Sequence, residues 1–466
     1  MRGVNVSLLQ RVAASAVLVA AATTAGAAPL PLPASPALLK IASIAFTERS
    51  LPNGLQFIAV PSSASPTVSV QVWYRVGGKD DPQGRSGFAH LFEHLMFKST
   101  RYMKNEQFDR LTEDVGGANN AFTSADVTAY HEAIPSNHLE TLLWAEAERM
   151  SNLNVDEANF KSESAVVKEE YRQRVLAEPY GRFYDGIDTA AFLVHPYKRP
   201  TIGSIADLDA ASLADVAAFH TTYYRPDNAT LVVAGDFDPK QLDAWVDKYF
   251  GPIERPAQPV PRVTTAEPAW PSDRQVALTG PNVPLPAVAL NWLAPPATSP
   301  DAPALQIAAA LLSGGESARL HQSLVYRQQI ATQASFQVDL RDGPGLLTAV
   351  AIGASGKQLR DVQAALLAEI RRLAEKPVAA AELVKVKTQL LTDARLARET
   401  PTGLAHAVAE AAVLQRSAAQ VNTGLQALLA VTAADVQRVI RRYVVQPHQV
   451  IVDYTQEKSA ASGAIQ

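Results

Sequence analysis

Cysteine is absent from all 466 positions of the chain. This absence excludes disulfide bonds, a thiolate nucleophile and any zinc site built on cysteine. A metal site in this chain would therefore use histidine, aspartate or glutamate. The sequence also lacks an excess of basic residues, with 42 Lys and Arg against 46 Asp and Glu and a formal charge of −4. Without a basic surplus to follow a phosphate backbone, nucleic acid is not expected as a partner.

An apolar run long enough to span a membrane is also missing, although the N-terminus carries a short one. Arg2 and Arg11 precede the run, residues 12–22 are small and apolar, and residues 25–28 are Ala-Gly-Ala-Ala. This order predicts a cleavable signal peptide over residues 1–28. The alternative, a membrane anchor, is disfavoured because the run is shorter than the ~20 residues that a spanning helix needs. We therefore expect an exported, periplasmic protein with no stable membrane span, and secretion remains an alternative.

The rest of the chain reads as two related halves. Residues 255–273 are dense in proline and have neither a helical nor a strand period, which is typical of a semi-rigid linker. Ser212-Leu213-Ala214-Asp215 in the first half and Thr432-Ala433-Ala434-Asp435 in the second are each followed by a tyrosine, a proline and an apolar strand. The repeat predicts an α+β fold with two duplicated domains, at residues 41–254 and 274–457, each a mostly antiparallel sheet covered by helices. Because the helices are grouped between the strands, they are expected on one face of the sheet.

The clearest chemical motif is His90-Leu91-Phe92-Glu93-His94, in a stretch with helical periodicity and no helix breaker. Residues four apart share one face of a helix, so both imidazoles can reach one ion. Glu93 lies beside that face, where it can hold a water molecule. The order reverses the commoner His-Glu-x-x-His motif and keeps its ligand spacing. The motif therefore indicates a zinc site on a helix.

Catalytic zinc needs a third protein ligand and an open position. A helix expected over residues 156–174 supplies candidates, since it presents Glu163, Glu169 and Glu170 within residues 161–170. Glu163 and Glu170 are two turns apart and share a face, whereas Glu169 points about a quarter-turn away. One of the pair could bind the ion while the other orients a ligand or the water. The spacing alone does not decide between them, and a solvated helix face is the alternative reading.

These motifs resemble the pitrilysin/insulinase family of zinc peptidases, and within it the short members such as the mitochondrial processing peptidase. The family's third ligand follows its motif at a long spacing, matched here by the 75 residues between His94 and Glu170. A second family glutamate, seven residues before that ligand, falls on Glu163. The family's edge strand, with Gly-Gly ahead of Asn-Ala, matches Gly116-Gly117-Ala118-Asn119-Asn120-Ala121-Phe122-Thr123.

The resemblance implies one zinc ion per chain, bound by His90, His94 and Glu170. It also implies that Glu93 is the general base, that Glu163 belongs to the catalytic site and that Asn120 hydrogen-bonds the substrate backbone. The strand at residues 118–123 would then bind a peptide as an added strand. The implied activity is that of a zinc metalloendopeptidase acting on short or unfolded peptides.

The second half departs from the family. Members that work alone carry an Arg and a Tyr after a Gly-Gly turn, where they help to hold the substrate carbonyl. After Gly314-Gly315 the aligned positions, seven apart, are Val325 and Thr332. Loss of such a donor typically costs about a hundredfold or more in rate. We therefore expect the chain to be the zinc-bearing subunit of a heterodimer whose homologous partner supplies the pair. A homodimer, an active monomer and a non-catalytic structural or binding subunit are the alternatives.

Overall fold

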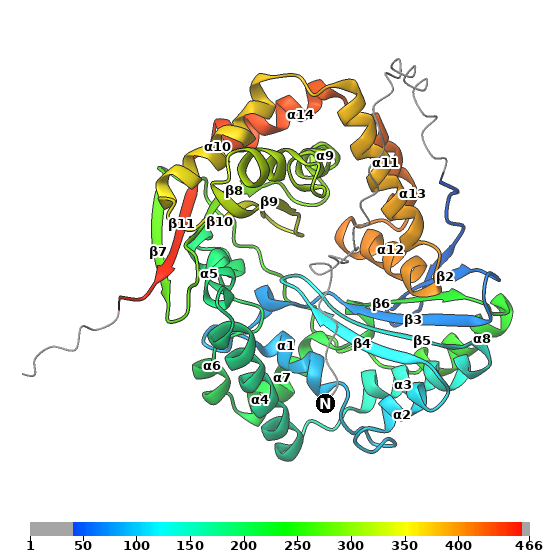
Figure 1. The fold of residues 1–466 in the computed structure, drawn as a ribbon. Coiled ribbons are helices and arrows are strands. Elements are labelled where there is room, and N and C mark those ends of the chain that lie inside the picture. The colour runs from blue at the N-terminus through cyan, green and yellow to red at the C-terminus, as the bar shows by residue number, and fades with distance from the viewer. Residues whose placement is uncertain (1–40, 459–466) are drawn as a thin grey trace, which may run out of the picture. The chain divides into compact units, whose positions relative to one another are not determined.

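The computed structural model describes residues 41–458 (Figure 1). The predicted signal peptide at residues 1–28 lies outside these residues. Within the described part of the chain, no helix has both the length and the apolar composition required to cross a membrane.

Six strands form the first sheet, in the order β1-β2-β6-β3-β5-β4. Their bounds are Thr47–Ser50 (β1), Gln56–Pro61 (β2), Thr67–Tyr74 (β3), Ala118–Thr123 (β4), Thr128–Pro135 (β5) and Ala229–Gly235 (β6). Among these strands β2 and β6 run parallel, and the other neighbours are antiparallel. The strand order leaves β4, which spans the same residues as the predicted edge strand, at an edge of the sheet.

The second sheet has five strands in the order β7-β11-β8-β10-β9. Their bounds are Arg274–Gly280 (β7), Ala287–Ala294 (β8), Ala331–Asp339 (β9), Gly345–Gly353 (β10) and Val450–Gln456 (β11). Here β7 and β11 are the parallel pair. If β1 is left out, the five strands of each sheet have the same spatial order. Numbered by their position in the chain, they lie side by side as first, fifth, second, fourth and third. The predicted α+β fold with two duplicated, mostly antiparallel sheets is confirmed.

Helices follow the strands in both halves. The first half has α1 (Phe88–Leu95), α2 (Gln107–Glu113), α3 (Leu139–Asn152), α4 (Glu157–Tyr171), α5 (Gly181–Ala191), α6 (Ile205–Asp209), α7 (Leu213–Tyr223) and α8 (Pro239–Phe250). The second has α9 (Ala302–Ser313), α10 (Leu359–Glu375), α11 (Ala380–Ala397), α12 (Pro401–Leu414), α13 (Gln420–Ala430) and α14 (Ala433–Ile440). Residues 251–273 contain no helix or strand. The exact domain limits given above stay a prediction.

The repeated sequence builds the same helix start twice. The side chains of Ser212 and Thr432 accept the backbone N–H groups of Asp215 and Asp435, and both aspartates accept the N–H of the capping residue in return. Such a capping box satisfies donors that the first turn of a helix leaves unpaired. The motif therefore fixes where α7 and α14 begin.

Each sheet is covered on both faces, and one cover comes from the other half of the chain. On one face of the first sheet, Val70 and Val72 of β3 pack with Phe92 of α1. On the opposite face, a second core contains Trp73 of β3 together with Val408 of α12, and Figure 1 shows α12 on the side away from α3 and α8. In the same way, α5 of the first half shares a core with β8 and β11 of the second sheet. The sequence predicted helices on one face only, because a cover from a distant segment leaves no local pattern.

A buried ion group lies between α3 and the first sheet. Arg149 of α3 donates to Glu146 and, over 2.8 Å, to Glu132 of β5, and all three side chains are fully buried. Its guanidinium also lies over the rings of Phe108 and Tyr130. Burial, and after it the neighbouring Glu146, raises the pKa of Glu132. The one buried cation therefore pairs with both carboxylates and holds α3 on the sheet.

Candidate metal centre

The helix that carries the two histidines begins at a conformation only glycine adopts easily. Gly87 has φ 93°, and a Cβ there would lie 2.7 Å from the carbonyl oxygen of Ile202. The carboxylate of buried Asp81 accepts the N–H groups of Gly87 and Ala89 at 2.7 and 2.9 Å. It thereby satisfies backbone donors at the start of α1. Burial raises the pKa of Asp81 to about 7.

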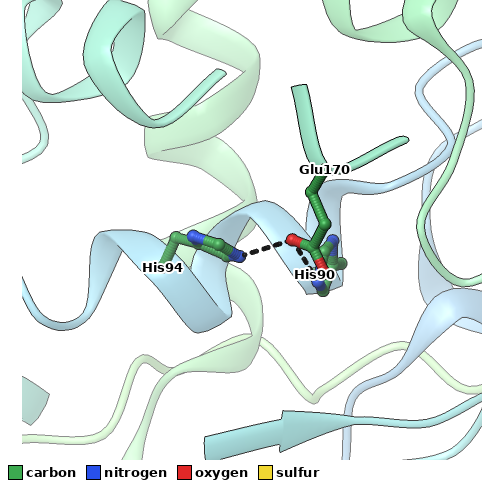
Figure 2. Close-up of side chains that lie close together, drawn as sticks. All are labelled: His90, His94 and Glu170. Carbon is green, nitrogen blue, oxygen red and sulfur yellow. Dashed lines mark ion pairs between the residues drawn. The ribbon is translucent and has the colours of Figure 1, made fainter. Parts of the chain in front are cut away.

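Three side chains meet between α1 and α4. Asp156 caps α4 by accepting the N–H of Asn159, and the helix carries Glu170 to the face of α1 where His90 and His94 lie. The Glu170 Oε2 atom is 3.4 Å from His94 Nε2 and 3.7 Å from His90 Nε2 (Figure 2). One ligand atom from each residue lies within 4.8 Å of the other two.

These distances fit one tetrahedral ion. Two ligands of zinc, each about 2.0–2.2 Å from the metal, lie about 3.4 Å apart. The donor set of two imidazoles and one carboxylate also leaves the fourth position free for a small molecule. The residues present therefore suit zinc, in agreement with the site that the motif predicts.

Glu163 lies on the other side of His94. Its Oε2 atom is 3.7 Å from His94 Nδ1, while its Oε1 atom is 2.7 Å from Lys98 Nζ and accepts the hydroxyl of Ser162 at 3.0 Å. A carboxylate on the second nitrogen of an imidazole fixes the ring's tautomer and orientation. The two glutamates that shared a helix face in the sequence are thus separated by geometry, with Glu170 at the cluster and Glu163 behind it.

The ionisable groups of the cluster have opposite shifts. Burial, and after it His94, lowers the pKa of His90 to about 4. Burial also acts to lower the pKa of His94, but contacts with Glu163 and Glu170 outweigh it and raise that pKa to about 9. Both glutamates have a lowered pKa although burial opposes it, because His94 contacts each of them. His90 is therefore neutral at pH 7, and a metal at this site would compete with a proton on His94.

Glu93 is half-buried beside the cluster. Its Oε2 atom accepts the hydroxyl of Thr123, the last residue of β4, at 2.7 Å. Burial raises the pKa of Glu93, and the bond from Thr123 opposes this rise. A carboxylate with a raised pKa is better matched to taking a proton near neutral pH.

Asn120 lies on β4, opposite His131 in β5. Successive side chains of a strand point to opposite faces, so Asn120 and Thr123 project from different faces of β4. The Oδ1 atom of Asn120 accepts the N–H of Ala121 at 2.8 Å. The structure thus places the predicted substrate contact on the strand that borders Glu93.

Three contacts in the centre were missed in the sequence. Thr123 contacts Glu93, Lys98 contacts Glu163, and Arg174 Nη1 lies 2.5 Å from Glu170 Oε1. Arg174 follows Glu170 by four positions, the spacing of an ion pair along one helix, so that signal could have identified it. Lys98 lies three residues beyond the end of α1, so its contact depends on how that segment meets α4, as the Thr123 contact depends on how β4 meets α1.

A duplicated α+β fold whose first half carries His-x-x-Glu-His on a helix, facing a glutamate helix, defines the class of inverted-motif metallopeptidases. The sequence matches the family described as Insulinase (Peptidase family M16) over residues 57–204, and that described as Peptidase M16 inactive domain over residues 210–390. The chain belongs to the peptidase M16 (insulinase) family, which confirms the resemblance noted from the motifs.

Curated relatives and solved structures agree with this assignment. The chain is 33% identical over 347 residues to Zinc protease PqqE of Helicobacter pylori, covering 74% of this chain and 78% of the relative. It is 23% identical over 404 residues to the probable mitochondrial-processing peptidase subunit beta of Arabidopsis thaliana, covering 85% and 75%. The crystal structure of a protease from Helicobacter pylori superposes with a TM-score of 0.85 at 30% identity, covering 88% of this chain and all of that one.

Proposed function

We propose that the chain is a zinc metalloendopeptidase, with one zinc ion held by His90, His94 and Glu170 and with Glu93 as general base. The observation that carries this proposal is the convergence of the three ligand atoms within 4.8 Å, with the Glu93 carboxylate held beside them by Thr123. Membership in a peptidase family and relatives named zinc proteases support the same reading.

Zinc at such a site supplies Lewis-acid activation of water and of the scissile carbonyl. The protein's own groups do the rest. Glu93 accepts the proton of the attacking water and donates it to the leaving amine, which its raised pKa favours. Glu163 orients the ring of His94 through Nδ1.

Short or unfolded peptides are the proposed substrates. The edge strand β4 has one side unpaired in the sheet order, so an extended peptide can add there through main-chain hydrogen bonds. Thr123 ends this strand at Glu93, so a peptide along β4 runs toward the catalytic carboxylate. Asn120 is proposed to hydrogen-bond its backbone.

The test is hydrolysis of a quenched fluorescent peptide library by the purified mature protein, with zinc content measured in parallel. We expect Glu93→Gln to keep its zinc and lose cleavage, and Glu170→Gln to lose both. Glu169→Gln is the matched control, because Glu169 is the adjacent residue on α4 and its side chain is 56% exposed. If the wild-type chain binds zinc but cleaves no peptide, alone or with a homologous partner, the non-catalytic binding subunit replaces this proposal.

We also propose that the active form is a heterodimer with a homologous chain that supplies an Arg/Tyr pair. The support is the sequence: Val325 and Thr332 stand at the aligned positions. The neighbouring Tyr326 lies in the same π-helical segment as Val325, His321–Arg327, and is 70% exposed. A relative named as a subunit beta is consistent with this. We expect co-purification with a homologous chain to raise kcat/KM about a hundredfold or more. Full activity of a sample that light scattering shows to be monomeric would contradict the heterodimer. It would leave the proposed peptidase activity unaffected.

The periplasm is the proposed location, on the strength of the predicted signal peptide at residues 1–28. Mass spectrometry of protein recovered from a periplasmic extract should find a mature N-terminus close to residue 29. An intact Met1 in the cytosolic fraction would contradict this location.

A further inference from the structure

A second polar cavity lies away from the metal cluster. It has a volume of about 170 Å³, and none of its lining residues belongs to that cluster. Its walls come from the end of β3, from residues 262–263 between the two sheets, from the β9–β10 turn and from the segment joining α12 to α13. Four cationic side chains line it, namely Arg75, Lys79, Arg262 and Arg416.

Arg75 is the unusual member of this set. Its backbone is fixed, since its N–H donates to the carbonyl of Asn228 and its own carbonyl accepts from Arg262 at 2.9 Å. Its half-buried guanidinium, however, makes no hydrogen bond or ion pair with any of residues 41–458. An arginine presents five donors, and none of those of Arg75 is a fully buried atom without a partner, so its guanidinium faces the cavity with donors that no protein group uses.

The acids nearby are already engaged. Asp126 accepts from Lys79 at 2.6 Å and from the hydroxyl of Tyr197 at 2.5 Å. Asp342 pairs with Arg416 and, at 3.3 Å, with Lys79. With two lining carboxylates against four cations, the cavity has an excess of two positive charges.

Repulsion among the arginines is part of this environment. Burial, and after it Arg416 and Arg262, lowers the pKa of Arg75. Burial likewise lowers the pKa of Arg262, with Asp80 opposing and Arg416 adding to the decrease. Burial raises the pKa of Asp80 to about 6, and its carboxylate accepts the N–H of Gly77 at 3.0 Å, so near pH 7 it is a counter-charge for Arg262 that acts from outside the lining residues.

We propose that this cavity binds a small, doubly charged oxyanion of the phosphate type, with Arg75 as its principal donor and Arg262 and Arg416 beside it. The excess of two positive charges matches the charge of such an ion, and guanidinium groups match its oxygens in pairs. The volume of about 170 Å³ selects the size, because pockets for whole drug-sized ligands measure about 300–1,000 Å³. The bound ion is either free phosphate or the phosphate group of a monoester.

Such an ion would tie together parts of the chain that are far apart in sequence. Arg75 directly follows β3 of the first sheet, Arg262 belongs to the segment that joins the two sheets in the chain, and Arg416 belongs to the turn after α12. Binding to the folded chain alone stabilises it in proportion to the logarithm of ligand concentration. The ion would therefore act as a stabilising ligand of the assembled halves.

The experiment is calorimetric titration of the full mature protein with inorganic phosphate, and in a separate arm with phosphoserine, in phosphate-free buffer at low salt. Thermal unfolding is followed at the same ligand concentrations, with chloride at matched ionic strength. We expect saturable one-to-one binding and a Tm that rises with phosphate but not with chloride. Preference for one arm identifies the source of the phosphate group.

Variants decide whether the cavity is responsible. Arg75→Gln should weaken binding by about tenfold or more, since hydrogen bonds to charged groups each contribute that much. In phosphate-free buffer its Tm should equal or exceed the wild-type value, because a repelling charge is gone. The matched control is Arg360→Gln, which removes the same charge from a side chain that is 88% exposed and should bind like wild type. Arg416→Gln repeats the test at a side chain that is 51% exposed, in case Arg75→Gln folds poorly.

Absence of saturable binding, or equal affinity in the cavity variants and wild type, would overturn the proposal. Phosphate bound only at the metal cluster would give the second result.

Discussion

Glu163→Gln is expected to weaken zinc binding although Glu163 is not a proposed ligand. Its carboxylate faces His94 Nδ1 at 3.7 Å and holds Lys98 Nζ at 2.7 Å. The amide keeps the shape of the side chain but removes the charge that orients the ring. Groups in this position typically contribute 10–100-fold to metal affinity, or about 1.4–2.7 kcal/mol.

The proton on His94 makes this effect depend on pH. In the wild type the His94 pKa is raised to about 9, so at pH 7 zinc must displace a proton at a cost of about a hundredfold in apparent affinity. Removing Glu163 lowers that pKa and relieves part of the competition. The ratio of zinc Kd between variant and wild type should therefore be about tenfold at pH 7 and approach a hundredfold near pH 9.

Chelator competition at the two pH values measures both ratios. Glu157→Gln is the control, because Glu157 begins the same helix and pairs with Lys161 at the surface. The reasoning fails if the Glu163→Gln ratio stays below about twofold at both pH values, or if it falls as the pH rises.

Three further outcomes are expected. Thr123→Val removes the 2.7 Å hydrogen bond to Glu93. It should lower kcat about tenfold and leave zinc content and KM unchanged, because a hydrogen bond that contributes about 1.4 kcal/mol corresponds to a factor of ten in rate. An unchanged kcat would refute the role of that bond. Arg149→Met strands two buried carboxylates and should lower the free energy of unfolding in urea by about 3–5 kcal/mol, and a loss below about 1 kcal/mol would contradict the account of this ion group. Burial and then Asp188 raise the pKa of Asp185 from 3.8 to about 6, so its folded form holds a proton longer than the unfolded chain and wild-type stability falls as the pH rises from about 4 to 6. Asp185→Asn should therefore be more stable than wild type above pH 6, by at most about 3 kcal/mol, and equal to it near pH 4; a constant difference across this range counts against the assignment.

Much of the fold and of the metal centre could be predicted from local sequence patterns. The four-residue spacing of His90 and His94 and the seven-residue spacing of Glu163 and Glu170 each describe one helix face, and α1 and α4 present those faces to each other. The capping motifs at Ser212 and Thr432 likewise act within one turn. Such features depend on a few neighbouring residues, so they can be predicted from the sequence.

Contacts between distant segments were not predictable in the same way. Spacing could not decide which glutamate meets the histidines, because that depends on the axial offset between α1 and α4. The contact of Thr123 with Glu93 joins a sheet edge to a helix. The cover that α12 forms on the first sheet joins segments far apart in the chain. Each of these depends on tertiary packing, which leaves no periodic signal in the sequence.

The most direct test of the metal centre is anomalous diffraction at the zinc absorption edge from crystals of the purified mature protein, with zinc content measured on the same sample. The account predicts one zinc per chain and a single anomalous peak bonded to Nε2 of His90, Nε2 of His94 and a carboxylate oxygen of Glu170, with the peak absent from Glu170→Gln. A peak at another set of residues, or a Glu170→Gln protein that keeps full zinc at the same position, would contradict it.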